Sequence, residues 1–576
     1  MAMNKDINYA AEYHEATKHS ETSLMSSRHY LDFDNKPIPF KVYLELPSVP
    51  LPVNFPTPEV NTIRCITSRI HQTSRIMRSS SKSTSISEDT RATSGNMPNI
   101  DLADLAEILF FSAGITREMK YPYGNYYMRA ASATGALYPI ELYVVCDDIS
   151  PSLDAGAYHF SPADFSLTQI RKGKYKGYLA ASANNQDILS SPIIIIFTSF
   201  AWRNAWKYQA RSYRHWFWDS GVIAANLVAT TAAMELPTRL IMGFVDEHID
   251  QLLCLEYQKE AAIVMAAIGV GQSEGPIKIP QQDAEIKICC QSAPKIRPLS
   301  KRTETNYPEI WKLNEASKLT NKEDVRRWIS KSHRHDDLLV SMPHSSYEKM
   351  TNGGGVNSTI PKELENDINN SLSLKETILW RGSTRKFTRS SISLSALKTI
   401  LYSASRGVQM DILKEGKSLI DIYFIANAVD GLNPGAYFYN RDTDSLKKIK
   451  EIAASRNISA YLCLGQSLFG DASAVFFLLS DLQSILKSLG NRGYRACQFE
   501  AGIITGKLYL ASYALRLGAS GSTFFDDAVT EFFSAHAGDK SAMMAVGVGV
   551  PAYKAVPGKI LPVRLSKNQL TTEDFT

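Results

Sequence analysis

The sequence predicts an α+β protein in which two copies of one domain pack against each other as an intramolecular pseudo-dimer. Three short motifs indicate the duplication, because each recurs in the second half of the chain: Gly156-Ala157-Tyr158 as Gly435-Ala436-Tyr437, Tyr213-Arg214 as Tyr494-Arg495, and Gly269-Val270-Gly271 as Gly547-Val548-Gly549. Chance can give one such match, but three at nearly the same interval indicate a duplicated domain, far longer than a solenoid repeat. Such copies commonly pair around a pseudo-twofold axis. Predicted helices and strands alternate irregularly, which favours the α+β class.

The first copy begins with a helix at 101–109, where apolar residues are spaced by three and four and Asp101 can cap the first turn. Residues 140–145 predict a strand, and the β-branched run at 193–197 predicts a buried strand. Residues 221–234 are mostly small, and they predict a helix that can pack tightly against a neighbour.

The second copy repeats this order. A helix is expected at 395–402, followed by strands at 420–426 and 474–479. A long helix is expected at 500–517, ended by Gly518.

These elements divide the chain into five parts, which are an N-terminal segment at 1–60, a loop at 61–99, the first copy at 100–275, a polar linker at 276–365 and the second copy at 366–576. The serine-rich run at 79–85 is typical of a loop or of disorder. Three glycines at 353–355 mark a flexible joint in the linker.

Composition excludes several classes of protein. The net charge of +5 is too small to indicate nucleic-acid binding. No apolar run reaches about 20 residues, so no membrane helix is expected, and the N-terminus lacks the apolar stretch of a secretory signal. The seven cysteines form no CxxC pair, so reduced thiols are expected rather than disulfides or a zinc site.

A basic segment at 381–387, Arg-Gly-Ser-Thr-Arg-Lys-Phe, precedes the first helix of the second copy. Arg381 and Arg385 flank Ser383 and can converge on a phosphate, because arginine binds phosphate bidentately and the hydroxyl adds a neutral donor. A solvated basic loop is the alternative.

Two segments of small residues can lie against a planar ligand. Residues 518–521 follow the long helix, and their glycines let the backbone approach a ring and present amides, although a helix cap with a tight turn is the alternative. Residues 129–139 lead into the first strand, and an ordinary loop is the alternative there. The candidates in the two segments are Gly518, Ala519, Gly521, Arg129, Ser132, Ala133 and Gly135.

Lys207 and Tyr208 lie in an aromatic segment at 202–218. A partly desolvated lysine beside a tyrosine hydroxyl can act as a proton-transfer pair. The alternative is a surface lysine next to a packed tyrosine. His215 is expected to be structural, because the sequence places no partner near it.

Together these segments resemble the nitroreductase-fold flavin family, and more narrowly its SagB-type branch, the azoline dehydrogenases of thiazole/oxazole-modified peptide biosynthesis. Residues 132–143 are similar to the branch's Ser-Ala-Gly-Gly-x-x-Pro-x-Glu-x-Tyr segment, and residues 207–214 are similar to its Lys-Tyr-x-x-Arg-x-Tyr-Arg segment. Residues 13–18 and 31–41 resemble its N-terminal signature.

The second copy resembles the wider family, because residues 381–387 are similar to the family's Arg-Arg-Ser-x-Arg-x-Phe motif and residues 517–521 to its Gly-Leu-Gly loop. In that family the arginines and the serine bind the FMN phosphate, the glycine loop lies beside the isoalloxazine, and the Lys-Tyr pair is catalytic. The resemblance implies that Lys207 and Tyr208 are catalytic and that no metal is used. It implies FMN ligands at Arg381, Ser383, Arg385, Gly518, Ala519, Gly521, Arg129, Ser132, Ala133 and Gly135.

Each copy lacks a different part of this site. The first copy has Met-Glu-Leu-Pro at 234–237 in place of the glycine loop, and a serine-rich stretch in place of the phosphate motif. The second copy has 413–418 in place of the Ser-Ala-Gly-Gly loop, and it has Ser488 and Leu489 at the positions of the Lys-Tyr pair. In the family, FMN lies at the dimer interface and takes these two sets of contacts from different subunits. The resemblance therefore implies one complete FMN site and one empty pseudo-site per chain.

The implied reaction is oxidation of a thiazoline or oxazoline ring in a ribosomal peptide to a thiazole or oxazole. FMN would accept a hydride, Lys207 or Tyr208 would remove the second proton or polarise the ring, and oxygen would reoxidise the flavin. The implied partners are the modified peptide and a cyclodehydratase complex, in the cytoplasm, with further oligomerisation open. Two alternatives remain: an NAD(P)H-dependent nitroreductase or quinone reductase, and a non-catalytic flavin-binding partner of a peptide-modifying complex.

Overall fold

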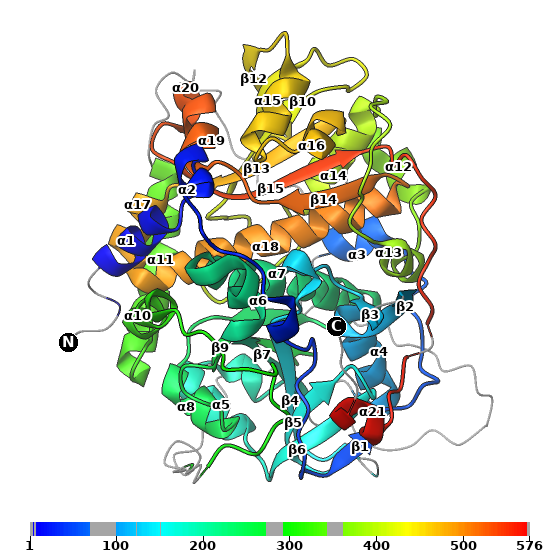
Figure 1. The fold of residues 1–576 in the computed structure, drawn as a ribbon, viewed down its shortest axis with the longest axis vertical. Coiled ribbons are helices and arrows are strands. Elements are labelled where there is room, and N and C mark those ends of the chain that lie inside the picture. Colours follow the sequence, from blue (N-terminus) through cyan, green and yellow to red (C-terminus); the bar gives the residue numbers. More distant parts are fainter. Residues whose placement is uncertain are drawn as a thin grey trace, which may run out of the picture.

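The computed structural model describes residue 4 and residues 7–68, 99–121, 124–149, 151, 153–271, 288, 292–341, 361–560 and 562–572. Two long helices, α7 (Ser212–Ala233) and α18 (Asn491–Ala514), cross at the centre of the molecule. One sheet from each copy packs on opposite sides of this helix pair (Figure 1).

The two sheets have the same strand order, which confirms the duplication. The first sheet runs β1 (Ser48–Pro50), β6 (Ser166–Lys172), β5 (Gly156–Ser161), β4 (Ile140–Cys146), β7 (Ile193–Phe200), β9 (Glu260–Ile268) and β8 (Thr238–Ile241). The second runs β12 (Ser445–Glu451), β11 (Gly435–Asn440), β10 (Asp421–Ala426), β13 (Ala474–Ser480), β15 (Ser541–Gly549) and β14 (Gly518–Ser522). Neighbouring strands pair antiparallel in both sheets, as the α+β class predicts. A separate hairpin joins β2 (Ile115–Tyr121) to β3 (Gly124–Arg129).

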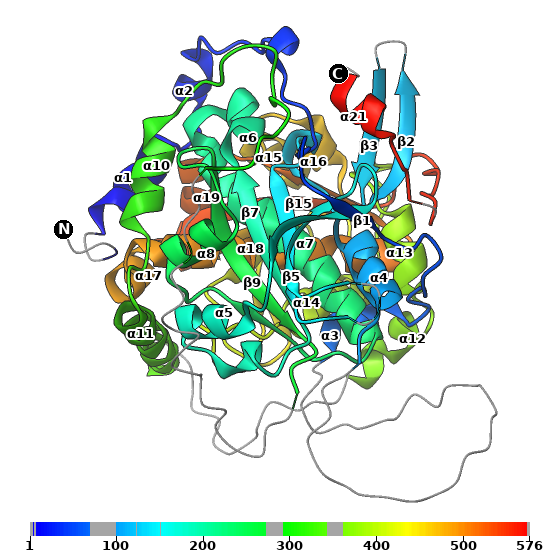
Figure 2. The same cartoon turned by 90° about the horizontal axis from the view of Figure 1, so that it is seen from below.

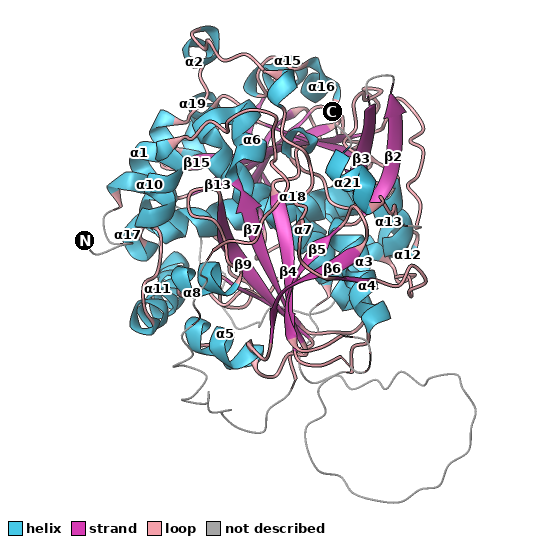
Figure 3. Cartoon of the chain, turned by 60° about the horizontal axis from the view of Figure 1, so that its bottom comes forward, coloured by secondary structure: helices cyan, strands magenta, loops and turns pink. Residues whose placement is uncertain are grey.

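Helices surround the sheets on their outer faces (Figure 3). The outer face of the first sheet is covered by α5 (Lys176–Ala183) and α8 (Asp246–Leu252), and that of the second by α15 (Ser455–Leu462), α16 (Ser467–Asp471), α19 (Asp526–Phe532) and α20 (Ser534–Ala537). The other helices are α1 (Asn8–Ala16), α2 (Glu21–Met25), α3 (Thr62–Thr67), α4 (Leu102–Ala113), α6 (Ala201–Tyr208), α10 (Pro308–Ala316), α11 (Lys322–Ser341), α12 (Glu365–Asn369), α13 (Leu374–Trp380), α14 (Leu394–Ala404), α17 (Leu482–Leu489) and α21 (Lys567–Thr572).

Strand β7 shows why the central strands are apolar throughout. Ile193, Ile195 and Phe197 point to the core that contains α7 and α18, whereas Ile194 and Ile196 point to the outer cluster beneath α5 and α8. Both faces of the strand are therefore buried, which explains the uninterrupted β-branched run. The inner core contains residues of both copies, so one hydrophobic core continues across the pseudo-dimer interface.

The crossing of α7 and α18 depends on two equivalent glycines. A Cβ atom added to Gly221 would lie 2.5 Å from the Phe499 carbonyl oxygen, and one added to Gly502 would lie 2.6 Å from the Trp218 carbonyl oxygen. Glycine at these positions lets the two backbones approach more closely than any side chain would permit.

A second pair of equivalent contacts holds the copies together. Each copy provides two arginines that bind one buried aspartate of the other copy, and burial of all six side chains gives these pairs low solvent screening. The contacts are Arg211 Nη1–Asp526 Oδ2 at 3.0 Å, Arg214 Nη1–Asp526 Oδ1 at 2.7 Å, Arg492 Nη1–Asp246 Oδ2 at 2.6 Å and Arg495 Nη1–Asp246 Oδ1 at 2.8 Å.

The N-terminal segment is part of this structure. Helix α1 lies beside α10 and α17 (Figure 2), and Arg214 donates hydrogen bonds to the His14 carbonyl at 2.7 Å and the Thr17 hydroxyl at 2.9 Å. Lys41 forms a buried ion pair with Glu260 of the first sheet at 2.5 Å. The two stretches that resemble a family signature therefore anchor this segment to the first copy.

Two segments expected to be irregular are partly helical. The predicted loop at 61–99 begins with α3, whose Ile63 and Ile66 are buried, and the predicted linker at 276–365 contains α10 and α11, which bury Trp311 and Trp328. The expectation was wrong there because a few apolar residues suffice to dock a short helix on an existing core. The runs at 79–85 and 353–355 lie outside the described residues.

The long second-copy helix differs from its predicted bounds. It begins at Asn491 rather than at residue 500 and ends at Ala514, before the expected stop at Gly518. Arg516 takes the left-handed conformation at φ 62°, and Gly518 is the first residue of β14. A non-glycine residue therefore breaks the helix, which the sequence pattern did not reveal.

The expectation of uniformly reduced thiols was wrong at Cys254, which is disulfide-bonded. The other described cysteines, Cys65, Cys146, Cys463 and Cys497, are free and buried. Folding can join cysteines that are far apart in sequence, and spacing rules do not detect such a pair. Within the described chain, no helix is long and apolar enough to cross a bilayer, and no cluster of metal-binding side chains is present.

Candidate active site

The structure brings the predicted half-sites of the two copies together. Arg381 of the second copy donates from Nε to the Ala130 carbonyl at 2.8 Å and from Nη2 to the Arg129 carbonyl at 2.7 Å. The guanidinium is buried, and this burial lowers its pKa. Arg381 therefore braces the small-residue loop of the first copy, a role that the sequence analysis did not identify.

The small-residue loop has a strained backbone. Gly135, Ala136 and Tyr138 have φ values of 64°, 54° and 50°, a left-handed region that residues other than glycine rarely adopt. Thr134 donates from its amide at 2.9 Å and from its hydroxyl at 2.7 Å to Asp219 Oδ1. These bonds hold the loop from below, and they leave Ser132, Ala133 and Gly135 accessible.

Lys207 and Tyr208 form the last turn of α6 and meet this loop. A Cβ atom on Gly135 would lie 2.8 Å from the Tyr208 hydroxyl oxygen, and the Lys207 ammonium lies 5.3 Å from the centre of the Tyr208 ring. The next residue, Gln209, takes a positive φ that a non-glycine residue rarely adopts, and a glycine, Gly490, stands at its position in the second copy. A strained backbone conformation persists only where the surrounding structure holds it in place. The end of α6 is therefore held firmly against the loop.

Three cations from three parts of the chain, Lys36, Lys207 and Arg385, influence one another electrostatically at this site. Burial lowers the pKa of Lys207, and the Arg385 guanidinium of the second copy lowers it further. Burial also lowers the pKa of Lys36 in the N-terminal segment, with Lys207 adding to the effect. In the described part of the chain, no carboxylate forms an ion pair with any of the three. Clustered cations without an anion are stabilised by an anionic ligand, so this site favours a phosphate.

The phosphate motif and the glycine segment of the second copy pack directly on each other. The Thr384 amide donates to the Ala519 carbonyl at 2.9 Å, and a Cβ atom on Gly518 would lie 2.2 Å from the Thr384 hydroxyl oxygen. The segment was expected to be a loop or turn but forms strand β14, because it completes the ladder with β15. Gly518 is needed for this close packing rather than for a turn.

The Gly521 amide is already hydrogen-bonded within the protein. It donates to the Tyr509 hydroxyl at 2.5 Å, and the same hydroxyl lies 3.3 Å from Ser383 Oγ. Tyr509 projects from α18 and was not identified from the sequence, because a tyrosine in a helix gives no pattern of its own. A flavin can use the Gly521 amide only if the Tyr509 hydroxyl moves.

The remaining residues fit FMN. The cations Lys36 and Arg385 suit its phosphate, and the accessible loop around Gly135 suits a planar ring. Within the described residues, Arg129 Nε is buried without a hydrogen-bond partner, and burial lowers the Arg129 pKa to about 10. An unsatisfied buried donor beside this loop is the kind of group that a ligand acceptor satisfies.

A buried ion network fixes α6 relative to the loop. Arg203 of α6 donates to the Tyr138 carbonyl at 2.9 Å and forms an ion pair with Glu141, which also binds His159 at 2.7 Å. Arg203 and neighbouring cations hold the pKa of Glu141 down at about 2 against the opposing effect of burial. The sequence signal was a glutamate inside an apolar strand, which only a buried partner can stabilise.

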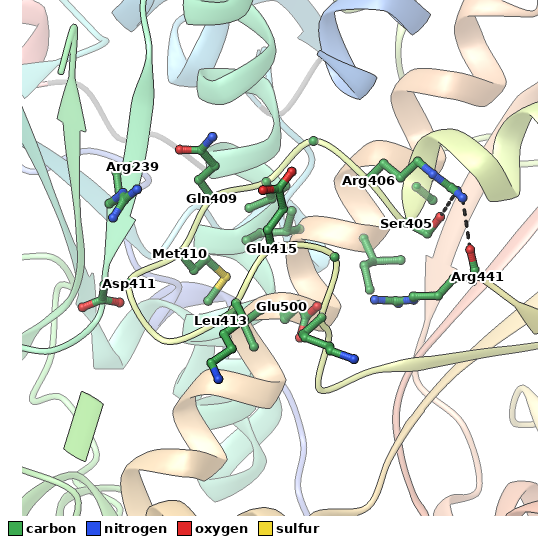
Figure 4. Close-up of a pocket in the computed structure, with 18 of the residues that line it drawn as sticks. Arg239, Ser405, Arg406, Gln409, Met410, Asp411, Leu413, Glu415, Arg441 and Glu500 are labelled. Atoms are coloured by element: carbon green, nitrogen blue, oxygen red, sulfur yellow. Dashed lines mark hydrogen bonds between the residues drawn. The ribbon is translucent and has the colours of Figure 1, made fainter. Parts of the chain in front are cut away.

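The pseudo-symmetric counterpart of this site is a cavity of about 300 Å³ between the copies (Figure 4). Glu500 occupies the position of Asp219, and it likewise holds a loop, by accepting hydrogen bonds from the Ser418 hydroxyl at 2.5 Å and the Leu419 amide at 2.7 Å. The counterpart loop therefore keeps its anchor, although its sequence has changed.

The arginines of this counterpart cavity are already bound. Arg406 contacts both oxygens of Asp444, at 2.7 and 2.9 Å, and Arg239 pairs with Asp187 at 3.1 Å. Arg441 donates to the Ile420 carbonyl at 3.0 Å. The cation cluster of the candidate site is therefore matched here by arginines that are neutralised or hydrogen-bonded within the protein.

Comparison with known families locates the duplication independently. The model of the Nitroreductase family matches residues 96–272 and 378–550, once in each copy. A crystal structure described as that of a nitroreductase from Anabaena variabilis superposes with a TM-score of 0.64 at 23% identity, over 94% of this chain and 99% of the other. At that identity the likeness establishes the fold alone.

Three curated relatives each match between 23% and 29% of the chain. The chain is 25% identical to MJ1384 of Methanocaldococcus jannaschii, named as a nitroreductase, over 28% of this chain and 83% of the relative. It is 28% identical to the trifolitoxin-processing protein TfxB of Rhizobium leguminosarum, over 29% of this chain and 47% of TfxB. It is 24% identical to the microcin B17-processing protein McbC of Escherichia coli, over 23% of this chain and 52% of McbC. The match thus spans about half the length of TfxB and of McbC.

Proposed function

The chain belongs to the nitroreductase family, and from this premise we propose that it is an FMN-dependent dehydrogenase that oxidises thiazoline or oxazoline rings of a ribosomal peptide to thiazoles or oxazoles. The observation that carries the proposal is that Tyr208 meets the Gly135 loop of the first copy, which Arg381 of the second copy braces. The Arg385 charge of the second copy also acts on the pKa of Lys207 and of Tyr208. Similarity to TfxB and McbC supports a peptide as the substrate.

FMN, when bound, supplies the acceptor for the hydride that leaves the azoline ring. Arg385, Ser383 and Lys36 would bind its phosphate, and the loop around Gly135 would support its ring. These assignments use one set of residues from each copy, so a single chain assembles a complete site.

Side chains of the protein would remove the second hydrogen as a proton. Oxidation to the aromatic ring breaks two C–H bonds, and the one not lost as hydride releases a proton. Lowering the pKa of Lys207 raises the fraction of neutral amine that can accept this proton. Burial and Asp219 raise the pKa of Tyr208, so its hydroxyl stays protonated and can donate a hydrogen bond to the ring nitrogen.

A reductase that uses NAD(P)H on nitro or quinone compounds is the second candidate, favoured by the similarity to MJ1384. The reductase reaction gives Lys207 and Tyr208 no role. A cyclodehydratase complex is the partner expected for the azoline oxidase, because such a complex forms the azoline ring.

The deciding experiment is anaerobic single-turnover bleaching of the bound flavin. We expect an azoline peptide to bleach the parent, and Lys207→Ala and Tyr208→Phe to retain FMN but bleach about 10²- to 10⁴-fold more slowly. The matched second-copy variants, Ser488→Ala and Leu489→Ala, keep the parent rate. If NAD(P)H bleaches the parent and no azoline peptide does, the reductase is the function. If the flavin bleaches at equal rates in the parent and in Lys207→Ala, Lys207 and Tyr208 have only a packing role.

A further inference from the structure

A groove of about 700 Å³ opens beside the candidate active site. Its walls come from residues 23–35 of the N-terminal segment, from α6, and from residues 305–307. The volume lies within the roughly 300–1,000 Å³ of typical ligand pockets. Several lining groups are polar and uncharged, including the hydroxyls of Ser23, Ser27 and Tyr307 and the amide of Gln209.

The groove borders the end of α6 that carries the Lys207-Tyr208 pair. Trp206 and Gln209, which flank the pair directly in the chain, both line it. Lys36 and Ala136 line a separate cleft of about 30 Å³ between the N-terminal segment and the loop. The N-terminal segment therefore borders both openings.

The floor of the groove is rigid. The Trp206 indole donates to the Asp32 carbonyl at 2.9 Å, and the Trp202 indole donates to Ser300 Oγ at 2.6 Å. Both indoles are buried and their polar atoms are satisfied, so they form a fixed apolar base for the groove. At its rim Tyr30 is 81% exposed, so an aromatic side chain stands uncovered above this floor.

We propose that this groove holds the segment of the substrate peptide that adjoins the ring being oxidised. The inference rests on the proposed azoline oxidation. An azoline ring is part of the peptide backbone, so the peptide continues beyond the reacting ring, and the groove has the volume to hold such a segment. An extended peptide presents backbone N–H and C=O groups to the polar lining and side chains to Tyr30.

The test compares two equally exposed side chains of one segment. Tyr30, at 81% exposure, lines the groove, whereas Met25, at 79%, does not. Anaerobic bleaching of the FMN-loaded full chain is measured against azoline-peptide concentration. We expect the half-saturating concentration to rise at least about fivefold in Tyr30→Ala, as for loss of an aromatic contact, and to stay at the parent value in Met25→Ala. Equal half-saturation in all three proteins overturns the proposal.

A second measurement does not depend on turnover. A photo-reactive phenylalanine analogue placed at position 30, and separately at position 25, is irradiated with labelled azoline peptide. Cross-linking from position 30 alone supports the groove. Cross-linking to a second copy of this chain, or to no peptide from position 30, overturns it. If position 30 cross-links to the azoline peptide but the flavin of the parent is never bleached, the groove binds the peptide and the proposed oxidation is wrong.

Discussion

Arg381 and Arg385 belong to one motif, yet their surroundings give them different tasks. Arg381 is 8% exposed and directs two donors to backbone carbonyls of the other copy. Arg385 is exposed, and its charge acts on Lys207 across the interface. Arg385 is therefore the arginine free to bind a phosphate, and Arg381 shapes the loop on which a ring would lie.

We predict that Arg385→Ala selectively weakens binding of the phosphorylated flavin. Loss of a charge-assisted contact costs roughly 1.5–3 kcal/mol, so FMN affinity should fall about 10- to 100-fold while riboflavin affinity changes little. Arg381→Lys is the matched control, because loss of the loop brace should weaken both ligands alike. Fluorescence titration with FMN and riboflavin gives the four affinities. Equal losses for the two flavins in Arg385→Ala would assign that residue to structure.

Asp219 makes stability depend on pH. It is buried beneath the Gly135 loop, and burial raises its pKa to about 7 despite hydrogen bonds from Thr134 and Asn204. A carboxyl in the unfolded chain titrates near about 3.9, so the folded protein binds more protons between about pH 4 and pH 7. The stability that this group contributes is complete below about pH 4 and is lost progressively as the pH rises to about 7.

We therefore predict that Asp219→Asn flattens the decline in unfolding free energy between pH 5 and pH 8. The parent should lose roughly 1–3 kcal/mol more than the variant over this range. Urea unfolding at the two pH values measures the difference. Asp250, whose pKa burial also raises to about 7, titrates in both proteins and cancels from the comparison. Parallel pH profiles would mean that Asp219 is ionised in the folded protein.

The candidate residues predicted from the sequence stand in contiguous motifs, and polar residues that stand alone were not predicted. Lys207, Tyr208 and Arg385 lie in runs whose composition points to chemistry, and in the structure the Arg385 charge acts on the pKa of Lys207 and of Tyr208. Lys36, Asp219 and Tyr509 are single polar residues in a segment or helix, and only the fold places them at the site. Their roles follow from distances across the chain, which no local pattern contains.

At the scale of elements, the helix crossing of α7 and α18 sets the geometry of the whole interface. The sequence indicated tight packing through the small residues of α7. It did not reveal that Gly221 meets the backbone of α18 at Phe499 while Gly502 meets α7 at Trp218. The equivalent positions are in contact because the pseudo-twofold axis passes through the crossing.

We predict that Gly221→Ala and Gly502→Ala each destabilise the protein by roughly 1–3 kcal/mol, the usual cost of overpacking. The added methyl would lie 2.5 Å or 2.6 Å from a carbonyl oxygen of the partner helix, so the helices must separate. Gly382→Ala is the control, because its nearest neighbour would be the Tyr513 hydroxyl at 3.9 Å. Chemical unfolding measures the three differences. A neutral Gly221→Ala would mean that the helices move apart freely.

The predicted positions of helices and strands were most accurate where the apolar pattern of the sequence was clear. The helix capped by Asp101 forms as expected, with a capping box to Asp104, and the strands at 140–145 and 474–479 lie within β4 and β13. The short helices α3 and α10 were missed, because each is stabilised by docking rather than by its own sequence. A clear apolar pattern therefore predicts an element, whereas tertiary contact decides where the short helices form, and the largely polar helix α11 was missed despite its length.

At the scale of the molecule, the duplication separates structural residues from functional ones. The arginine pairs that bind Asp526 and Asp246 occur in both copies, as do the crossing glycines and the loop anchors Asp219 and Glu500. Features needed to hold two copies together are required on both sides of the axis. The Lys-Tyr pair and the phosphate motif are each present once among the described residues, which fits a requirement for one site only.

We predict about one FMN per chain. The candidate site combines a cation cluster with an accessible loop, whereas the arginines of the counterpart cavity are paired with Asp444 and Asp187 or bound to a carbonyl. Use of these arginines by a phosphate would break those contacts and leave buried or half-buried carboxylates without a partner. Flavin released from pure protein after saturation with FMN, measured against protein absorbance, gives the ratio. A reproducible value near two would show that the counterpart binds flavin as well, and a value of zero would remove FMN from the proposed function.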